Sequence, residues 1–214
     1  MKLIWGILAL SGCSHFPQHS ETCETKSAQL VQIEEQDQAD RAGPIDSIDW
    51  NKVSPRDTAR RIQIATIFAE GCFKKASDYA AAALVFQHGN NAAHFYQTFI
   101  WASKAVQLGD ESQRGLTAAG LDRYLVSSGQ KQLFGTQFGK GPTEMKRGAA
   151  GKWCLQPVEP SFPESLRMDY LKRNLNDNTT QVLKALGATQ TLRETQVCEP
   201  ALRSSPKGTV PGFW

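Results

Sequence analysis

The sequence predicts a mainly α-helical domain built from antiparallel helical hairpins. Apolar residues recur at helical spacing in four successive segments between residues 54 and 128. A glycine follows each segment, which is a common signal for a helix C-terminus. The connections between the segments are short, and short connections favour antiparallel neighbours.

Start and stop signals place these four helices. The first is expected to begin at Ser54-Pro55-Arg56-Asp57 and to stop at Gly71. The other three are expected over residues 78–88, 92–108 and 110–128. The run Ala80–Ala83 has no bulky side chain, so a neighbouring helix can approach it closely.

The chain changes character after Gly129. Glycine and proline interrupt any regular period up to residue 152, which predicts a Gly-rich loop. The elements expected after this loop are a short strand or extended arm over residues 153–158 and two further helices over residues 164–175 and 180–186. The helical domain is therefore expected to span residues 50–190, and residues 191–214 to form an extended C-terminal tail, either wrapped on the domain or loose.

The N-terminus has the features of an export signal. Lys2 precedes the short apolar run Leu3–Leu10, which is too short to cross a bilayer as a permanent helix. The quartet Leu10-Ser11-Gly12-Cys13 resembles a lipobox, the cleavage sequence of bacterial lipoproteins. An ordinary cleaved signal, or a soluble protein with an apolar start, is the alternative. The prediction is a signal peptide over residues 1–12.

The lipobox resemblance implies that Cys13 becomes the new N-terminus and carries acyl chains that anchor the protein to a membrane. It places the protein in the cell envelope. In such proteins an Asp directly after the lipidated cysteine keeps the protein in the inner membrane. Here that residue is Ser14, so the resemblance favours the outer membrane, with the protein facing the periplasm.

Residues 13–49 are predicted to form an acidic, flexible tether. Between Glu21 and Asp49 there are eight acidic residues and only two basic ones, and aromatic residues are scarce. Such a composition buries too little apolar surface to fold alone, apart from a short helix around Ala28–Gln38. The chain from Trp50 onward is basic, which either attracts an anionic partner or simply keeps the surface soluble, and we favour the second.

The cysteines agree with an oxidising compartment. Four remain besides the lipidated one, and an even number suggests two disulfides with three possible connectivities. Buried thiols are the alternative. We predict that Cys72 pairs with Cys154 inside the domain and that Cys23 pairs with Cys198, joining the tether to the tail.

Two family resemblances bear on the domain. Residues 80–129 resemble Sel1-like repeats, relatives of the tetratricopeptide family, in their Ala-rich helix and in two terminal glycines, Gly89 and Gly129. Repeat arrays need about three units for stability, and one is clear, so the resemblance implies a related helix packing and not an array.

The second resemblance is to a family of bacterial proteins of unknown function. Its motifs appear here as Gln87-His88, Asp122-Arg123 and the stretch GQKQLFGTQ over residues 129–137. The similarity covers roughly residues 57–173, and it departs from the family at Gly71-Cys72-Phe73. It implies candidate positions but no activity.

These positions are predicted to meet in one polar cluster. Asp122 lies beside an apolar helical stripe and needs partners, while the loop after Gly129 has backbone groups that no regular element satisfies. The cluster either braces the loop or binds a ligand. His88 can act as a general base, although a helix-end histidine bonded to a carbonyl is the more common case. The full set is Gln87, His88, Asp122, Arg123, Gln132, Gly135, Thr136 and Gln137.

The sequence lacks a Walker phosphate loop, a nucleophile elbow, metal-ligand spacing and the basic–aromatic pattern of nucleic-acid binders. We therefore expect an envelope lipoprotein that binds a partner or braces an assembly, with no cofactor and no nucleic acid. Its expected partners are the membrane, through the lipid on Cys13, and an envelope protein or a polar or anionic ligand. The alternative is an envelope hydrolase with His88 as base, oriented by Asp122.

Overall fold

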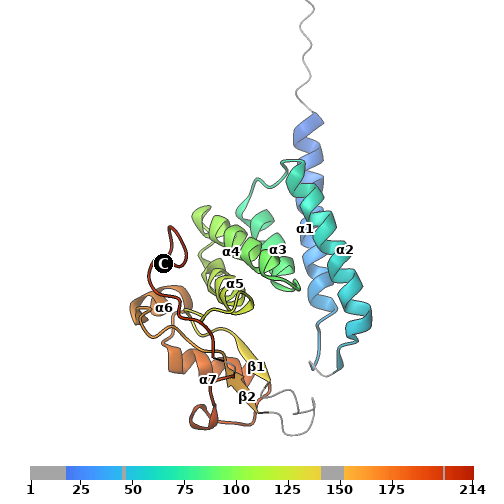
Figure 1. Cartoon of the computed structure of the whole chain (residues 1–214). Helices are drawn as coiled ribbons and strands as arrows, with labels where there is room; N and C mark the ends of the chain where they lie inside the picture. The colour runs from blue at the N-terminus through green and yellow to red at the C-terminus, as the bar shows by residue number, and fades with distance from the viewer. Residues whose placement is uncertain (1–17, 45–46, 141–151, 200) are drawn as a thin grey trace, which may run out of the picture.

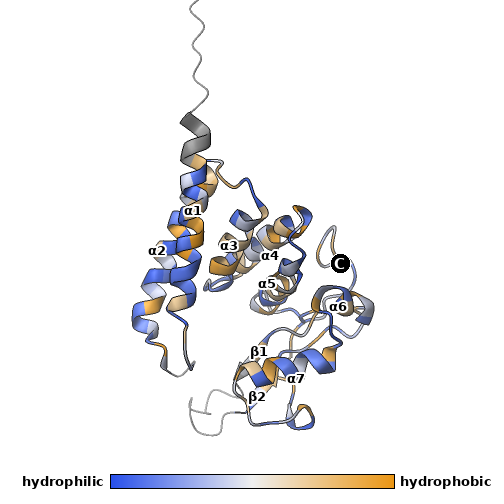
Figure 2. Cartoon of the chain, turned by 180° about the vertical axis from the view of Figure 1, so that it is seen from behind, coloured by the Kyte–Doolittle hydropathy of each residue, from blue (hydrophilic) through white to orange (hydrophobic). Residues whose placement is uncertain are grey.

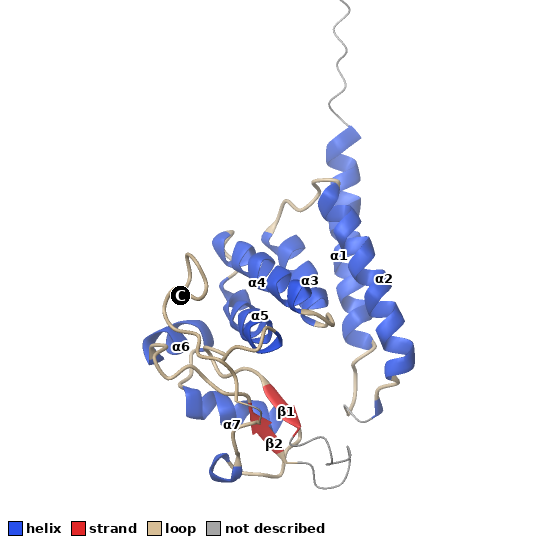
Figure 3. Cartoon of the chain, in the orientation of Figure 1, coloured by secondary structure: helices blue, strands red, loops and turns tan. Residues whose placement is uncertain are grey.

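The protein is mainly helical, as the sequence predicts (Figures 1 and 3). The computed structural model describes residues 18–44, 47–140, 152–199 and 201–214, so the predicted lipidation site at Cys13 lies outside the described residues. The helices are α1 (Gln18–Ala39), α2 (Trp50–Ala69), α3 (Ala76–Gln87), α4 (Ala92–Gln107), α5 (Arg114–Ser127), α6 (Glu164–Leu171) and α7 (Leu175–Ala185), with short 3-10 helices η2 (Glu111–Gln113) and η3 (Leu192–Glu194). Strands β1 (Phe138–Lys140) and β2 (Trp153–Leu155) pair antiparallel.

The elements form three neighbouring groups. Helices α1 and α2 make a long hairpin on one side, α3 to α5 lie in the middle, and α6, α7 and the two strands lie beyond them (Figure 1). One apolar cluster joins α1 to α4, and its largest fully buried members include Leu30, Ile64 and Ile67. A second cluster joins α4 and α5 to the loop after Gly129, and Phe134 and Phe162 are its largest buried side chains.

The middle helices pack closely because small residues lie at their contacts. Three alanines of α3, Ala81, Ala82 and Ala83, are almost completely buried. On α5, a Cβ added at Gly120 would lie 2.8 Å from Cγ2 of Thr98 and 2.9 Å from the backbone nitrogen of Phe99. Glycine at this position therefore lets α5 approach α4 more closely than any side chain would allow.

The segment expected to be a flexible tether is instead largely a folded helix. Helix α1 packs against α3 and α2 and buries Leu30, Ile33 and Asp37. Figure 2 shows hydrophilic residues over much of α1 and α2, with fewer hydrophobic ones between them. The composition argument failed because α1 does not fold alone: its few apolar residues are buried by other helices, and a disulfide holds it to them.

Several boundaries also differ from expectation. Helix α2 begins at Trp50, because Asp49 accepts a hydrogen bond from the backbone of Asn51 (3.2 Å), and Pro55 lies inside the helix. Helix α7 begins at Leu175 and not at residue 180, because the side chain of Asn174 caps it through the backbone nitrogen of Asp177 (2.8 Å).

The C-terminal segment is wrapped on the domain and is not loose. The backbone nitrogen of Lys131 donates to the Arg203 carbonyl (2.8 Å), and the Arg203 nitrogen donates to the Gly129 carbonyl (3.0 Å). Val210 is buried, and the Trp214 indole donates to the Ser205 carbonyl (2.8 Å). The wrap therefore supplies partners for the loop after Gly129.

The two expected disulfides are present, but the predicted pairing is wrong. Cys23 bonds Cys72, and Cys154 bonds Cys198, with Cα–Cα distances of 4.9 and 5.0 Å. The first joins α1 to the turn after α2, because these two helices form a hairpin. The second joins β2 to the C-terminal wrap, whose Cys198 nitrogen donates to the Leu155 carbonyl (2.9 Å). The pairing followed from treating α1 as a tether, which placed Cys23 outside the fold.

Glu159 holds the C-terminal wrap to the segment between β2 and α6. Its carboxylate accepts hydrogen bonds from the Ser204 hydroxyl (2.6 Å), the Ser205 nitrogen (2.8 Å) and the Ser161 hydroxyl (2.7 Å). Burial alone would raise the pKa of the Glu159 carboxyl, but these hydrogen bonds lower that pKa to about 2.

Because the folded-state pKa lies below the unfolded value, Glu159 stabilises the fold above about pH 4.3, and this stabilisation is lost as the pH falls toward 2. We predict that Glu159→Gln removes on the order of 2 kcal/mol of stability at pH 7 and flattens the dependence of stability on pH below 4.5. Urea unfolding at a series of pH values measures both effects. Equal pH dependence in the two proteins would contradict the role given to Glu159.

Candidate functional site

Asp122 on α5 binds the loop that follows the helix. Its carboxylate is fully buried and accepts hydrogen bonds from the backbone nitrogens of Leu133 (2.8 Å), Phe134 (3.0 Å) and Thr136 (2.9 Å), and from the Thr136 hydroxyl (2.8 Å). Burial raises the pKa of the Asp122 carboxyl, and these hydrogen bonds act in the opposite direction. One side chain thus satisfies two buried backbone amides and one half-buried amide that no regular element pairs.

Gln132 and Gly135 complete this loop. The buried amide of Gln132 donates to the carbonyls of Gln137 (3.0 Å) and Gln156 (2.7 Å) and accepts from the Gln137 nitrogen (2.8 Å). Gly135 has a φ of +80°, and its carbonyl accepts a hydrogen bond from Asn178 on α7 (2.9 Å). The loop is therefore fixed from α5, from the segment after β2 and from α7.

Arg123, the next residue on α5, is held by uncharged partners. Its Nε donates to Oε1 of Gln137 (3.0 Å), its Nη1 donates to the Gln87 carbonyl, and the guanidinium lies 5.4 Å from the centre of the Phe95 ring. Among the described residues no carboxylate forms an ion pair with it. Burial and the nearby charge of Arg41 both lower the pKa of Arg123. Its positive charge is thus fixed in position and not neutralised.

The imidazole of His88 lies against Asp37 and not against Asp122. Its Nδ1 is 2.7 Å from Oδ2 of Asp37, a fully buried residue of α1 that also accepts from Nη1 of Arg41 (2.9 Å). The contact between His88 and Asp122 that the hydrolase alternative required is absent, because all four hydrogen bonds of Asp122 go to the loop. Within the described part of the chain, Gln87 joins the cluster through its backbone carbonyl, and its buried side-chain oxygen has no hydrogen-bond partner there.

Asp37 belongs to a network of ion pairs between the end of α1 and α2. Arg41 bridges Asp37 and Asp57, Arg60 bridges Asp57 and Asp40, and Arg56 lies 2.7 Å from Asp40. Three aspartates meet three arginines, so the network is balanced in charge. Its members are Asp37, Asp40, Arg41, Arg56, Asp57 and Arg60.

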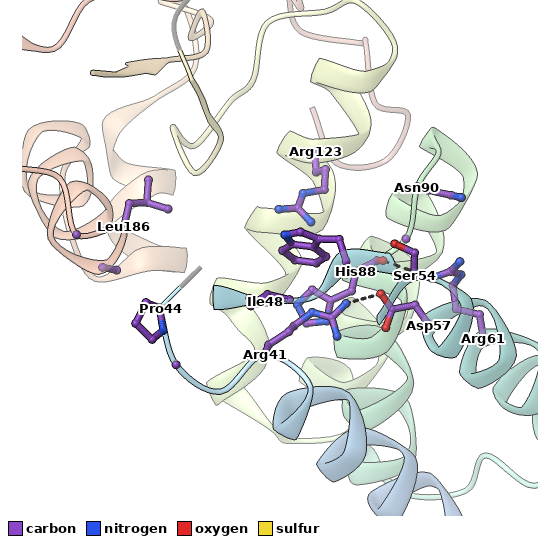
Figure 4. Close-up of a pocket in the computed structure, with 15 residues that line it drawn as sticks. Arg41, Pro44, Ile48, Ser54, Asp57, Arg61, His88, Asn90, Arg123 and Leu186 are labelled. Atoms are coloured by element: carbon purple, nitrogen blue, oxygen red, sulfur yellow. Dashed lines mark hydrogen bonds and ion pairs between the residues drawn. The ribbon is translucent and has the colours of Figure 1, made fainter. Parts of the chain in front are cut away.

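A cavity of about 880 Å³ opens beside this network (Figure 4). In Figure 4, Arg123 points from α5 toward the group that contains Arg41, His88 and Asp57. The apolar part of the lining comes from the α1–α2 connection, the first turn of α2 and the end of α7. Its residues include Pro44, Ile48, Trp50, Ala185 and Leu186.

Arg61 is the second cation of the cavity without an acidic partner. Its Nη1 donates to the His88 carbonyl (3.3 Å), and its Nη2 donates to the Thr58 hydroxyl (3.1 Å). No described carboxylate forms an ion pair with Arg61, and burial lowers its pKa. Arg61 and Arg123 thus bind the adjacent carbonyls of His88 and Gln87, so both cations lie at the C-terminal end of α3.

Other site classes find no support in the described part of the chain. The described residues contain no group of three or more His, Cys, Asp or Glu that could hold a metal ion. None of the described helices is long and apolar enough to span a bilayer. No protein-family model, curated protein or solved structure matches the chain.

Sequence reasoning located half of this site. The motif residues on α5 and in the loop come together, whereas Asp37, Arg41 and Arg61 were not singled out. Asp37 and Arg41 were missed because they were assigned to the tether. Their i, i+4 spacing on one helical face was a usable signal, because opposite charges at that spacing stabilise helices.

We predict that Asp122→Ala lowers the free energy of unfolding by about 3 kcal/mol, because three backbone amides lose their acceptor and a buried unpaired group costs about 1–3 kcal/mol. Asp169→Ala is the matched control: that carboxylate is half exposed and bonded to Arg114, and surface ion pairs contribute about 0–1 kcal/mol. Urea unfolding followed by circular dichroism compares the two. A loss below 1 kcal/mol for Asp122→Ala would show that the loop does not depend on it.

Proposed function

We propose that the chain is a lipid-anchored binding module of the bacterial cell envelope whose cavity takes up a polar or anionic ligand. The observation that carries this proposal is that Arg123 has hydrogen-bond donors that no described residue uses. A guanidinium has five N–H donors, and only Nε and Nη1 of Arg123 bond protein acceptors. Nη2 makes no hydrogen bond to a described residue, and it belongs to a side chain that lines the cavity.

The polar cluster gives Arg123 this position. Asp122 fixes the loop, the loop carries Gln137, and Gln137 holds Nε of Arg123. The amide of Gln137 is itself fixed, because it donates to the Thr136 hydroxyl (2.9 Å) and the Ala119 carbonyl (3.3 Å). A donor held in place before binding loses little entropy when a ligand arrives, so it favours affinity. The cluster therefore serves as a support for a ligand-binding arginine.

The size and lining of the cavity also support binding. Small-molecule sites are clefts of about 300–1,000 Å³ with apolar walls and a few convergent polar groups. This cavity has a comparable volume, an apolar wall that includes Ile48 and Leu186, and three arginines.

The location rests on the sequence. The Leu10-Ser11-Gly12-Cys13 quartet supports acylation at Cys13, and Ser14 supports the outer membrane. Both disulfides suit an oxidising compartment such as the periplasm.

A hydrolase is the second candidate, and the contact between His88 and Asp37 favours it. If the hydrogen of Nδ1 is donated to Asp37, Nε2 keeps its lone pair and can accept a proton from water. Asp37 then takes the orienting role that the sequence suggested for Asp122. Binding remains the first proposal, because the described lining offers only one hydroxyl, Ser54, as a nucleophile, and the described residues contain no group of three or more His, Cys, Asp or Glu that could hold a metal.

We predict that Cys13→Ser moves the protein from the membrane fraction to the soluble fraction and abolishes acylation. Each buried methylene of an acyl chain contributes about 0.8 kcal/mol of membrane affinity, and the variant carries no acyl chain. Metabolic labelling with a fatty-acid analogue and gradient fractionation measure both effects. Ser11→Ala, which keeps a small residue in the lipobox, is the control and should stay acylated. Retention of unlabelled Cys13→Ser in membranes would contradict the proposed anchor.

We predict that the protein purified from its own membranes carries a bound ligand and that Ser54→Phe removes it. Ser54 is exposed at the cavity, and its hydroxyl makes no hydrogen bond within the described residues, so phenylalanine fills space without breaking a contact. Native mass spectrometry detects the ligand as added mass. Gln63→Phe, exposed elsewhere on α2, is the control and should keep it.

An intact ligand favours binding over hydrolysis, whereas recovery of split fragments would favour the second candidate. Equal masses for wild type and Ser54→Phe, both without ligand, would count against the binding proposal.

A further inference from the structure

The charged groups around the cavity leave a surplus of two positive charges. The ion-pair network of α1 and α2 contains equal numbers of aspartates and arginines, and Arg41 lies within it. Arg61 and Arg123 have no described carboxylate partner. They bond adjacent carbonyls at the end of α3 and both line the cavity, so both charges lie at the same end of that helix.

The end of α3 does not balance this surplus. A helix C-terminus carries about half of one negative charge, whereas the two guanidiniums carry two positive charges. Burial lowers the pKa of both arginines, and the charge of Arg41 lowers both further. The charges of Asp57 and Asp37 act in the opposite direction on Arg61 alone. An anion between the guanidiniums relieves the repulsion among these positive charges, and the local interior strengthens the interaction because water is partly excluded.

Building on the proposed binding function, we propose that the ligand is an organic phosphate whose phosphate group is bound by Arg61 and Arg123 and whose apolar part packs on Ile48, Trp50 and Leu186. A phosphate monoester carries about 1.5 to 2 negative charges at pH 7 and three strong acceptor oxygens. It therefore matches two guanidiniums, whereas a carboxylate carries one charge. Planar guanidiniums bind phosphate through paired hydrogen bonds.

The apolar wall indicates that the ligand is more than inorganic phosphate. Ile48, Trp50 and Leu186 are all partly exposed at the cavity, and they come from two separate parts of the chain. Covering this surface with an aromatic or aliphatic group adds affinity in proportion to the apolar area removed from water.

The test uses the full chain with Cys13→Ser, so that no acyl chain interferes with vesicle binding. Isothermal titration is carried out with phenyl phosphate, inorganic phosphate, benzoate and phenol. We expect phenyl phosphate to bind at least tenfold more tightly than either benzoate or inorganic phosphate, and phenol to show no binding. Arg61→Gln and Arg123→Gln should each weaken phenyl phosphate binding tenfold or more, because each removes a charge-assisted contact.

Arg193→Gln is the matched control, because Arg193 is exposed on η3 and does not line the cavity, and it should leave affinity unchanged. Arg123→Gln also loses contacts to Gln137 and Gln87, so a melting curve accompanies each variant. If that variant unfolds, Arg61→Gln and the comparison of ligands on the unmutated cavity still decide the result.

Co-sedimentation with phosphatidylcholine vesicles, with and without phosphatidic acid, identifies the source of the phosphate. Binding that requires phosphatidic acid assigns a lipid headgroup, and binding of phenyl phosphate in solution alone assigns a soluble organic phosphate. Benzoate binding as tightly as phenyl phosphate, or unchanged affinity in both arginine variants, would overturn the phosphate assignment. If Ser54→Phe still removes a native ligand in that case, the binding function stands and the phosphate assignment alone fails.

Discussion

The buried carboxylate of Asp122 is the group on which the candidate site depends. It pairs three amides of a loop that has no regular hydrogen-bond ladder, and a buried unpaired amide is costly. The same loop carries Gln137, which holds Arg123 at the cavity. A structural brace and a binding site are often treated as alternatives for such clusters. Here the two roles are combined, since Asp122 and the loop hold Arg123, the hydrogen-bond donor that lines the cavity.

The charged side chains near the cavity also fall into two groups, one that stabilises the fold and one that is available to a ligand. Six charged side chains, from the end of α1, the turn after it and α2, neutralise one another and hold the hairpin together, at a place where unpaired charges would be costly. Arg61 and Arg123 stand outside that balance and are held by carbonyl, hydroxyl and amide oxygens. Neutral partners fix a guanidinium without cancelling its charge. The positive charges of Arg61 and Arg123 are therefore available to a ligand, while the ion-pair network holds the α1–α2 hairpin in place.

The sequence predicted the parts of the fold that depend on local signals. Helix α4 has apolar residues at helical spacing and a side-chain cap from Asn91, α3 is followed by Gly89, and the predicted bounds of both agree closely with the structure. The motif residues of α5 and the loop were located because Asp122 beside an apolar stripe requires partners. The short helix expected around Ala28–Gln38 lies inside α1, but the full length of α1 and its packing into the fold were not predicted, because its stability comes from contacts with other helices. Half of the site was missed with it, and so was the pairing of Cys23, because disulfide partners depend on the arrangement of helices.

The folded state of α1 also changes how the domain relates to its proposed anchor. An acidic tether reaching to residue 49 would let the domain move far from the membrane. Helix α1 begins at Gln18, five residues after Cys13, and five extended residues span at most about 18 Å. If Cys13 carries the lipid, the start of α1 is held within that distance of the membrane surface.

The cavity lies near the other end of the α1–α2 hairpin, where Arg41 and Ile48 line it. Since α1 has 22 residues and a helix rises about 1.5 Å per residue, the cavity lies about 30 Å along the helix from that start. The same helix that limits the domain's freedom thus sets the distance between the anchor and the cavity.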